Sequence, residues 1–298
     1  MQTTTTTSSP PEPEKNIIQQ KYKLEGILGR GQFGTVCRGC TLKNGNPVAI
    51  KLENLSTPVN SLRHESTILR HLYKQQVSSI PEVYYYGIQD PYICLVMTFY
   101  PERSLAHYEL EWEHIYEWWL QSCDILRHVH THGIVHRDIK PAHFMRVTLD
   151  ERTTQWHLID FGLATTYWDE NSQHQQLPST PKDSILGSPN WISLYIHQGY
   201  PPVRRDDYIS LVYIFVDLAL QTIDSGLDWL DRYSGFISTE CETNVQMMKH
   251  KQWKRLQKII QQTTLNEKIK YLFLKLLDVC SRLKFCDKPV YDQVIIEL

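Results

Sequence analysis

The apolar residues of the 298-residue chain follow a strand-like pattern up to about residue 100 and a helical pattern after it. Few folds accommodate such a change. From residue 22 to about residue 100, short runs of β-branched and aromatic residues predict strands, interrupted by one predicted helix over residues 59–73. The predicted strands cover residues 35–38, 47–52, 83–88 and 92–98. The predicted helices that follow cover residues 112–132, 206–221 and 266–283. A small β-rich part therefore precedes a larger α-rich part, an α+β arrangement with its join near residues 99–104.

The composition is that of an ordinary globular protein. Hydrophobic residues make up 41% of the chain, charged residues 21%, and the formal net charge is -2. These values exclude a fully disordered or fibrous chain and argue against a protein that mainly coats nucleic acid. Residues 1–15 are mostly Thr, Ser, Pro and Glu, which predicts a flexible tail and no secretory signal. The longest apolar stretch, residues 209–220, is too short to span a membrane, so we expect no membrane partner.

The seven scattered cysteines favour a reducing, intracellular compartment, cytoplasmic or nuclear, over a disulfide scaffold. A monomer is expected.

A glycine-rich element opens the β-rich part. Gly29, Gly31 and Gly34 form a G-x-G-x-x-G pattern, in which the backbone can close over phosphates because no Cβ is in the way. Residues with strand character follow, whereas a dinucleotide-binding pattern of this type would open a helix. Further on, Lys51 ends the sequence V-A-I-K. Such a lysine is often only a surface residue, and one that binds nucleotide phosphates needs a carboxylate partner, for which Glu65 is the candidate.

Two further motifs lie in the α-rich part. H-R-D-I-K-P occupies residues 136–141, and D-F-G begins at Asp160. Each triplet occurs by chance, but the glycine element, V-A-I-K, H-R-D and D-F-G in this order resemble the signature set of protein kinases. The resemblance implies the bilobal protein kinase fold. Its small β-rich N-lobe would span residues 22–100 and its larger, mainly α-helical C-lobe residues 101–298.

The resemblance also implies a role for several side chains. Asp160 would bind the Mg²⁺ that bridges the β- and γ-phosphates of ATP. Asp138 would orient the substrate hydroxyl and take its proton, and Lys140 would neutralise charge at the transferred phosphate. A lysine at position 140 is the pattern of Ser/Thr kinases, so the implied activity is transfer of the γ-phosphate of ATP to Ser or Thr of a protein substrate. Arg137 would face a phosphate or carboxylate of the activation segment.

Later motifs resemble the casein kinase one family and the related vaccinia-related kinases. The Ala-Pro-Glu triplet of other kinases is absent, and residues 187–193 read G-S-P-N-W-I-S where the family has G-T-A-R-Y-A-S. R-R-D-D at residues 204–207 and R-L-K-F-C-D-K-P-V-Y at residues 282–291 are also similar to family motifs. The resemblance covers residues 22–298. It implies that Ser188 lies near Asp138 and Lys140, and that a buried Asp207 ties the catalytic loop to the central helix.

The same resemblance implies where adenine would bind. Met97 resembles the gatekeeper, and residues 98–100 resemble the hinge. The other implied contacts, including the roof and floor of the pocket, are Leu28, Val36, Ala49, Tyr100 and Met145.

One departure from the family pattern bears on catalysis. The family reads H-R-D-x-K-P-x-N-F, and His143 stands where the asparagine that binds a second Mg²⁺ is expected. Three interpretations stay open. His143 ligates a divalent ion, with Mn²⁺ better tolerated than Mg²⁺; or it only hydrogen-bonds Asp138, leaving one Mg²⁺ on Asp160; or the protein is a pseudokinase scaffold that binds ATP and transfers nothing.

A second departure is Asn190, where the family has an arginine that helps to bind acidic or phosphorylated substrates. The local charges left for substrate recognition are then those of Arg204 and Arg205. Three other patterns are expected to be structural: the C-x-x-C of residues 37–40, the histidines at positions 128 and 132, and the basic stretch of residues 249–255, which is predicted to be a solvated helix face.

Overall fold

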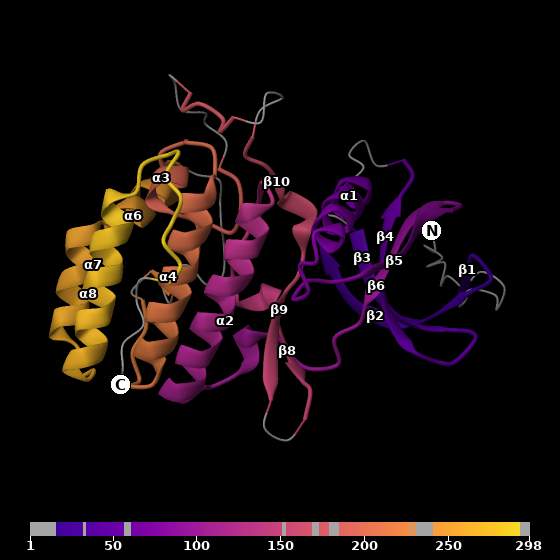
Figure 1. Cartoon of the computed structure of the whole chain (residues 1–298), viewed down its shortest axis with the longest axis horizontal. Helices are drawn as coiled ribbons and strands as arrows, with labels where there is room; N and C mark the ends of the chain where they lie inside the picture. Colours follow the sequence, from indigo (N-terminus) through magenta and orange to yellow (C-terminus); the bar gives the residue numbers. More distant parts are fainter. Residues whose placement is uncertain are drawn as a thin grey trace, which may run out of the picture. The chain divides into compact units, whose positions relative to one another are not determined.

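A computed structural model describes most of the chain (Figure 1). The described residues are 16–31, 34–56, 61–150, 153–168, 173–178, 185–227, 229–230 and 241–292. The chain forms two compact units, the first made of residues 1–70 and 81–101 and the second of residues 71–80 and 102–298. The predicted tail, residues 1–15, lies outside the described residues.

An antiparallel sheet forms most of the first unit. Its six strands lie in the order β1-β2-β3-β4-β6-β5 (Figure 1). They are β1 (Ile17–Ile18), β2 (Tyr22–Gly31), β3 (Gly34–Thr41), β4 (Pro47–Asn54), β5 (Val83–Gln89) and β6 (Tyr92–Thr98). The helix α1 (Ser61–Lys74) connects β4 to β5. The four predicted strands and the predicted helix over residues 59–73 are therefore confirmed.

Strand β6 is buried on both faces, which explains its unbroken apolar sequence. Alternate residues of a strand point to opposite faces of the sheet. Cys94 and Val96 pack in a cluster with residues of β1 to β4, whereas Ile93, Leu95 and Met97 pack with Leu62 of α1. A strand between two apolar layers reads as a continuous apolar run rather than an alternating one.

The second unit is mainly helical. Its longer helices are α2 (Trp112–Thr131), α4 (Arg204–Gln221), α6 (Cys241–His250), α7 (Trp253–Gln262) and α8 (Glu267–Arg282), with the short α3 (Leu194–His197). Its short strands are β7 (Ile134–Val135), β8 (Phe144–Thr148), β9 (Thr154–Leu158) and β10 (Thr165–Thr166), and they pair as β7 with β10 and β8 with β9. A β-sheet followed by a mainly helical region is the protein kinase fold, as predicted.

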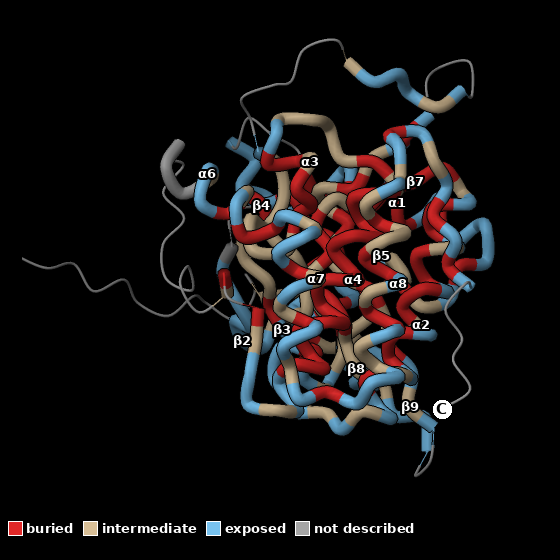
Figure 2. The backbone as a smooth tube through the Cα atoms, turned by 90° about the vertical axis from the view of Figure 1, so that its left-hand side faces the viewer, coloured by how far each residue is buried: buried red, intermediate tan, exposed pale blue. Residues whose placement is uncertain are grey.

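Helix α4 is the core of the second unit. Every residue from Arg205 to Leu220 is buried, as the red segment of α4 in Figure 2 shows. Because the helix is enclosed on all sides, its sequence is apolar almost all round. Phe215 stacks on Trp119 of α2 with ring centroids 4.5 Å apart, and it meets Phe273 of α8 edge-on at 5.1 Å. These rings join three helices that are far apart in sequence. Within the described part of the chain, no helix is both long and apolar enough to cross a membrane.

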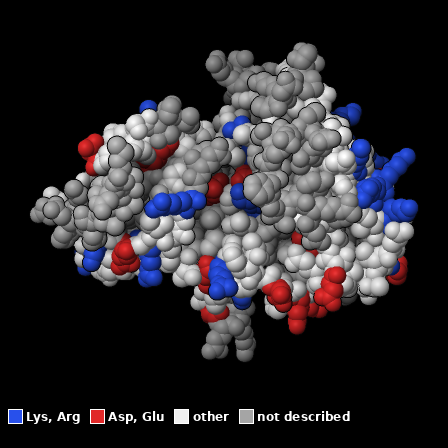
Figure 3. All heavy atoms as spheres, turned by 180° about the vertical axis from the view of Figure 1, so that it is seen from behind, with Lys and Arg blue, Asp and Glu red and all other residues white. Residues whose placement is uncertain are grey.

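The prediction that residues 249–255 form a solvated helix face is wrong in part. Helix α6 ends at His250 and α7 begins at Trp253, so the stretch contains a turn rather than one continuous helix. Lys254 and Arg255 are exposed. Figure 3 shows basic side chains gathered in one area of the surface. Lys251, by contrast, is fully buried. The turn between the helices directs this lysine inward.

Candidate active site

One face of the sheet in the first unit carries the predicted nucleotide-contacting residues. The register places Val36 opposite Lys51 and Ala49 opposite Met97. Cross-strand partners point to the same face, and residues two apart on β4 share it, so all four side chains lie on the face that packs against α1. Leu28 lies in a bulge of β2, and its side chain is 52% exposed.

Lys51 forms an ion pair with Glu65 of α1. The Nζ atom of Lys51 lies 2.7 Å from one carboxylate oxygen of Glu65 and 2.9 Å from the other. Glu65 is only 2% exposed, and a buried carboxylate is stable only with such a partner. The pairing predicted from the two positions in sequence is present.

A second buried carboxylate fixes α1 itself. Glu53, at the end of β4, accepts hydrogen bonds from the backbone N–H groups of Ser61 and Leu62 and from the Ser61 hydroxyl. These first N–H groups of a helix have no partner inside it, and a negative charge there is favourable. The role of Glu53 was not predicted, because a glutamate eight residues before the first residue of a helix matches no local capping pattern.

The glycines of the glycine-rich element lie at the end of β2 and at the start of β3. Gly34 adopts φ of 124°, and a Cβ there would lie 2.1 Å from the carbonyl oxygen of Leu52, so only glycine fits. At Gly29, by contrast, a Cβ would meet nothing within 4 Å, and the fold itself does not demand a glycine. Gly31 pairs with Gly34 across the two strands.

In the second unit, Asp207 of α4 holds the backbone of the H-R-D motif. Its two carboxylate oxygens accept the N–H groups of His136 at 2.7 Å and of Arg137 at 2.9 Å. Burial would raise the pKa of Asp207, but the hydrogen bond and charge of His130, and further donors, lower it below the usual value. Arg137 has φ of 69°, a left-handed conformation that costs energy unless its surroundings impose it. The Asp207 carboxylate supplies that constraint.

His136 connects this loop to the D-F-G motif. Its Nε2 lies 3.0 Å from the carbonyl oxygen of Ile159, so Nε2 carries the proton and donates it. Its Nδ1 accepts the N–H of Asp138 at 3.3 Å. The N–H of Ile159 in turn donates to the carbonyl of His143 at 2.9 Å. Asp160 follows Ile159 directly, so these bonds fix the backbone from which the Asp160 side chain extends.

The carboxylate of Asp138 is held from two sides. One oxygen accepts the N–H of Ser188 at 2.9 Å and its hydroxyl at 2.7 Å, and the other accepts Lys140 Nζ at 2.8 Å. Lys140 also donates to Ser188 Oγ at 3.1 Å. Burial would raise the pKa of Asp138, but His143, Lys140 and Ser188 together lower it below the usual value. The group is therefore an oriented carboxylate that stays ionised near neutral pH.

His143 lies between Asp138 and Asp160. Its Nδ1 is 2.9 Å from the backbone carbonyl oxygen of Asp138, and its Nε2 is 3.2 Å from Oδ2 of Asp160. A carbonyl can only accept, so Nδ1 carries a proton. A neutral His143 then presents the lone pair of Nε2 to the Asp160 carboxylate.

The model of the protein kinase domain matches residues 22–286. The chain belongs to the protein kinase family. A kinase domain transfers phosphate from ATP to protein substrates, and it typically works with a divalent metal ion.

The donor set of this kinase fits such an ion. When His143 is neutral, its Nε2 and Oδ2 of Asp160 are both acceptors, and at 3.2 Å a proton or a cation must lie between them. Two neighbouring ligands of an octahedral Mg²⁺ at about 2.1 Å would lie roughly 3 Å apart. Among the described residues, no group of three or more His, Cys, Asp or Glu side chains could hold a metal ion. Phosphate oxygens and water would supply the remaining ligands, as is usual for Mg²⁺.

The expectation that Arg204 and Arg205 remain available to substrates is wrong for Arg205, which is 4% exposed. Its guanidinium stacks 3.6 Å from the ring centroid of Tyr195. Arg204 is half-buried and donates to the carbonyl of Cys286 at 2.6 Å, with its guanidinium over the ring of Tyr167. Both charges are used to hold the kinase fold, which the R-R-D-D pattern alone does not reveal.

The remaining predicted residues have ordinary surroundings. Tyr100 belongs to the first unit, and burial raises its pKa. Met145 belongs to the second unit, where it pairs with His157 across β8 and β9. Cys37 is buried in the sheet core, and Nδ1 of His128 donates to a backbone carbonyl one turn earlier in α2.

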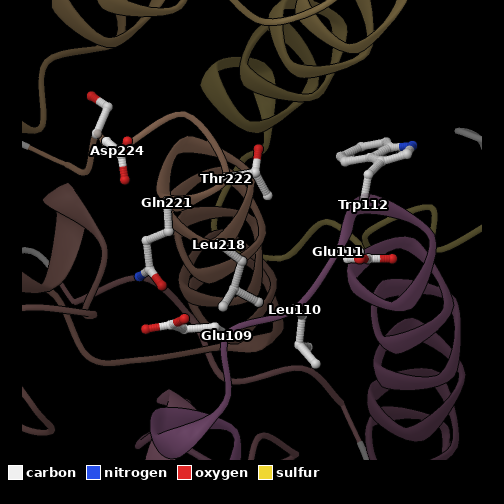
Figure 4. A pocket seen from close by; sticks show the side chains of 9 residues that line it. Glu109, Leu110, Glu111, Trp112, Leu218, Gln221, Thr222 and Asp224 are labelled. Atoms are coloured by element: carbon white, nitrogen blue, oxygen red, sulfur yellow. The ribbon is translucent and has the colours of Figure 1, made fainter.

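A separate cavity of about 610 Å³ opens between the start of α2 and the end of α4 (Figure 4). Glu109, Glu111 and Asp224 line it, which makes it acidic. None of the predicted site residues contributes to it.

Proposed function

We propose that this kinase transfers the γ-phosphate of ATP to Ser or Thr hydroxyls of protein substrates. The observation that carries the proposal is the bonding of Asp138, whose carboxylate is oriented by Ser188 and Lys140. An ionised, fixed carboxylate orients an incoming hydroxyl and accepts its proton. The ammonium of Lys140, 2.8 Å from that carboxylate, offsets the negative charge of a phosphate that approaches it.

His143 and Asp160 together would hold the divalent ion, and Lys51, fixed by Glu65, would contact the α/β-phosphates. The ion supplies charge neutralisation at the transferred phosphate when it is bound. An imidazole ligand favours softer ions, so we propose that Mn²⁺ supports the reaction better than Mg²⁺. The open space at Gly29 is compatible with a backbone that closes over phosphates.

The resemblance to the casein kinase one family does not extend to a preference for acidic sites. Asn190 replaces the family's arginine, and the guanidinium groups of Arg204 and Arg205 are engaged within the fold. We therefore propose that acidic or phosphorylated residues next to the target hydroxyl give little advantage. The free thiols among the described cysteines are in keeping with the intracellular location that we propose.

Transfer of label from γ-labelled ATP to casein tests the activity, with Mg²⁺ or Mn²⁺ and with peptides that offer Ser, Thr or Tyr. Wild type should label Ser and Thr peptides, and Asp138→Asn and Asp160→Ala should lose all transfer. Transfer that survives Asp160→Ala would refute the metal assignment. A wild type that transfers nothing with either ion, even as His143→Asn, would instead support the alternative, a nucleotide-binding pseudokinase scaffold.

The variant His143→Asn separates the interpretations of position 143. If the imidazole ligates the ion, the ratio of the rates with Mn²⁺ and Mg²⁺ should fall in His143→Asn, because an amide oxygen suits Mg²⁺ better than an imidazole nitrogen does. An unchanged ratio would leave Asp160 as the metal-binding side chain and His143 as a hydrogen-bond donor to Asp138.

A further inference from the structure

Lys251 is a buried cation outside the motifs that define the site. It lies in the turn between α6 and α7 and has no exposed surface. Its Nζ lies 2.7 Å from the carbonyl oxygens of both Pro189 and Ile192, and 3.1 Å from Nε2 of His197. Within the described part of the chain, no carboxylate forms an ion pair with it. Burying a charge in this way is costly, so its contacts need an explanation.

The hydrogen bonds around Lys251 fix its three protons. Nδ2 of Asn244 donates to the backbone carbonyl of His197 at 3.0 Å, which orients the amide and places its oxygen 2.6 Å from Nδ1 of His197. Nδ1 therefore carries the proton, and Nε2 can only accept. The ammonium of Lys251 thus meets three acceptors, one for each N–H bond. Burial lowers the pKa of Lys251 well below its usual value. A neutral amine, however, would turn a lone pair toward one of these three acceptors, so the contacts favour the ammonium.

Two of these acceptors belong to the turn that carries Ser188. The carbonyl of Ser188 accepts the N–H of Trp191 at 2.8 Å and that of Ile192 at 3.1 Å, which closes the turn. The indole N–H of the buried Trp229 donates to the carbonyl of Asn190 at 2.9 Å. The side chains of Lys251 and Trp229 thus bind three carbonyls of residues 189–192. On its other side the turn presents the N–H and hydroxyl of Ser188 to Asp138.

We propose that Lys251 is a positioning residue for phosphotransfer: its ammonium fixes the turn of residues 188–192, so that Ser188 can orient the Asp138 carboxylate. This inference rests on the proposed kinase activity. Lys251 does not touch the reacting groups and acts only through the turn. Its loss should therefore lower kcat for peptide phosphorylation and leave nucleotide binding unchanged.

The test is a double-mutant cycle with Lys251→Met and Ser188→Ala. Methionine keeps the length of the side chain and removes the three donors. Lys251→Met should lower kcat about 10-fold in the wild-type background and less than about 3-fold in Ser188→Ala, because two changes that act on one contact are not additive. The KM for ATP should stay the same. Lys249→Met, which removes an exposed lysine of the same stretch, should keep wild-type kinetics.

Equal losses of kcat in both backgrounds, or no loss, would overturn the proposal while leaving the kinase activity established. Should Lys251→Met not fold, Trp229→Phe, which removes one donor to the turn and keeps a ring, should show the same dependence on Ser188. If wild type transfers no phosphate, the proposed function fails, but hydrogen exchange still tests whether Lys251 fixes the turn. The amides of Trp191 and Ile192 should then exchange faster in Lys251→Met than in Lys249→Met, and equal rates would refute the positioning role.

Discussion

Acidification should destabilise the second unit through one buried histidine. His197, at the end of α3, is 3% exposed. Its Nδ1 donates to Asn244, and its Nε2 faces the ammonium of Lys251. Burial, and then the charge of Lys251, lower the pKa of His197 from 6.5 to about 3. A protonated His197 would turn an N–H toward that ammonium, and the imidazole therefore stays neutral in the folded protein.

The sign and size of the effect follow from this shift. The unfolded chain takes up a proton as the pH falls below about 6.5, whereas the folded chain resists until about 3. The contribution of His197 to stability is therefore complete above the unfolded-state pKa and is lost as the pH falls toward the folded-state pKa. At about 1.4 kcal/mol for each pKa unit, the total loss is about 5 kcal/mol, of which about 2 kcal/mol falls between pH 7 and pH 5.

Urea unfolding followed by tryptophan fluorescence at about pH 7, 6 and 5 measures this loss. His197→Gln removes the titrating group, and His114→Gln, a change of an exposed histidine of α2, is the control. The free energy of unfolding should fall by about 2 kcal/mol more in wild type and in His114→Gln than in His197→Gln. Equal decreases in all three proteins would refute the reasoning.

Three further changes test other parts of the molecule. Glu65→Gln replaces the carboxylate that holds Lys51, and a charge-assisted bond is worth about 1.5–3 kcal/mol, so kcat/KM for ATP should fall by about 10- to 100-fold in initial-rate assays. Lys140→Met removes one of the charges that lower the pKa of Asp138, so the acid limb of kcat/KM should move to higher pH; an unmoved limb would mean that another group titrates. Gly34→Ala places a Cβ 2.1 Å from a carbonyl oxygen of β4, so the melting temperature should fall by several degrees, and an unchanged value would contradict the close contact.

The sequence predicted those parts of the fold that rest on local periodicity. The strands β3 to β6 of the first unit and the helices α2, α4 and α8 lie where the apolar pattern places them, within a few residues, whereas β1 and β2 were not predicted. The pairing of Lys51 with Glu65 was also predictable, because Lys51 ends the V-A-I-K motif and Glu65 lies on the helix predicted to follow it. Ser188 was found in the same way, through the resemblance of residues 187–193 to a family motif.

What the sequence did not reveal are contacts between residues far apart in the chain. Lys251 binds carbonyls 59 and 62 residues earlier, and its neighbours K-H-K-Q-W-K-R suggest only a polar helix face. His130 contacts Tyr291, 161 residues later, while its other nitrogen donates to Asp207. Such contacts depend on how helices and strands pack against one another, and the strand period of 2 and the helix period of 3.6 residues do not predict them.

Two buried charges of opposite sign hold the two loops that meet at Asp138. The carboxylate of Asp207 accepts N–H groups of the loop that carries Asp138, and the ammonium of Lys251 donates to carbonyls of the turn that carries Ser188. Neither loop has a regular ladder to satisfy its peptide groups, and each buried peptide group left unpaired would cost about 1–3 kcal/mol. A charged group makes stronger hydrogen bonds than a neutral one, and it can bind several peptide groups at once. Charges that do not take part in the reaction can thus fix irregular backbone with the accuracy that the contact between Ser188 and Asp138 requires.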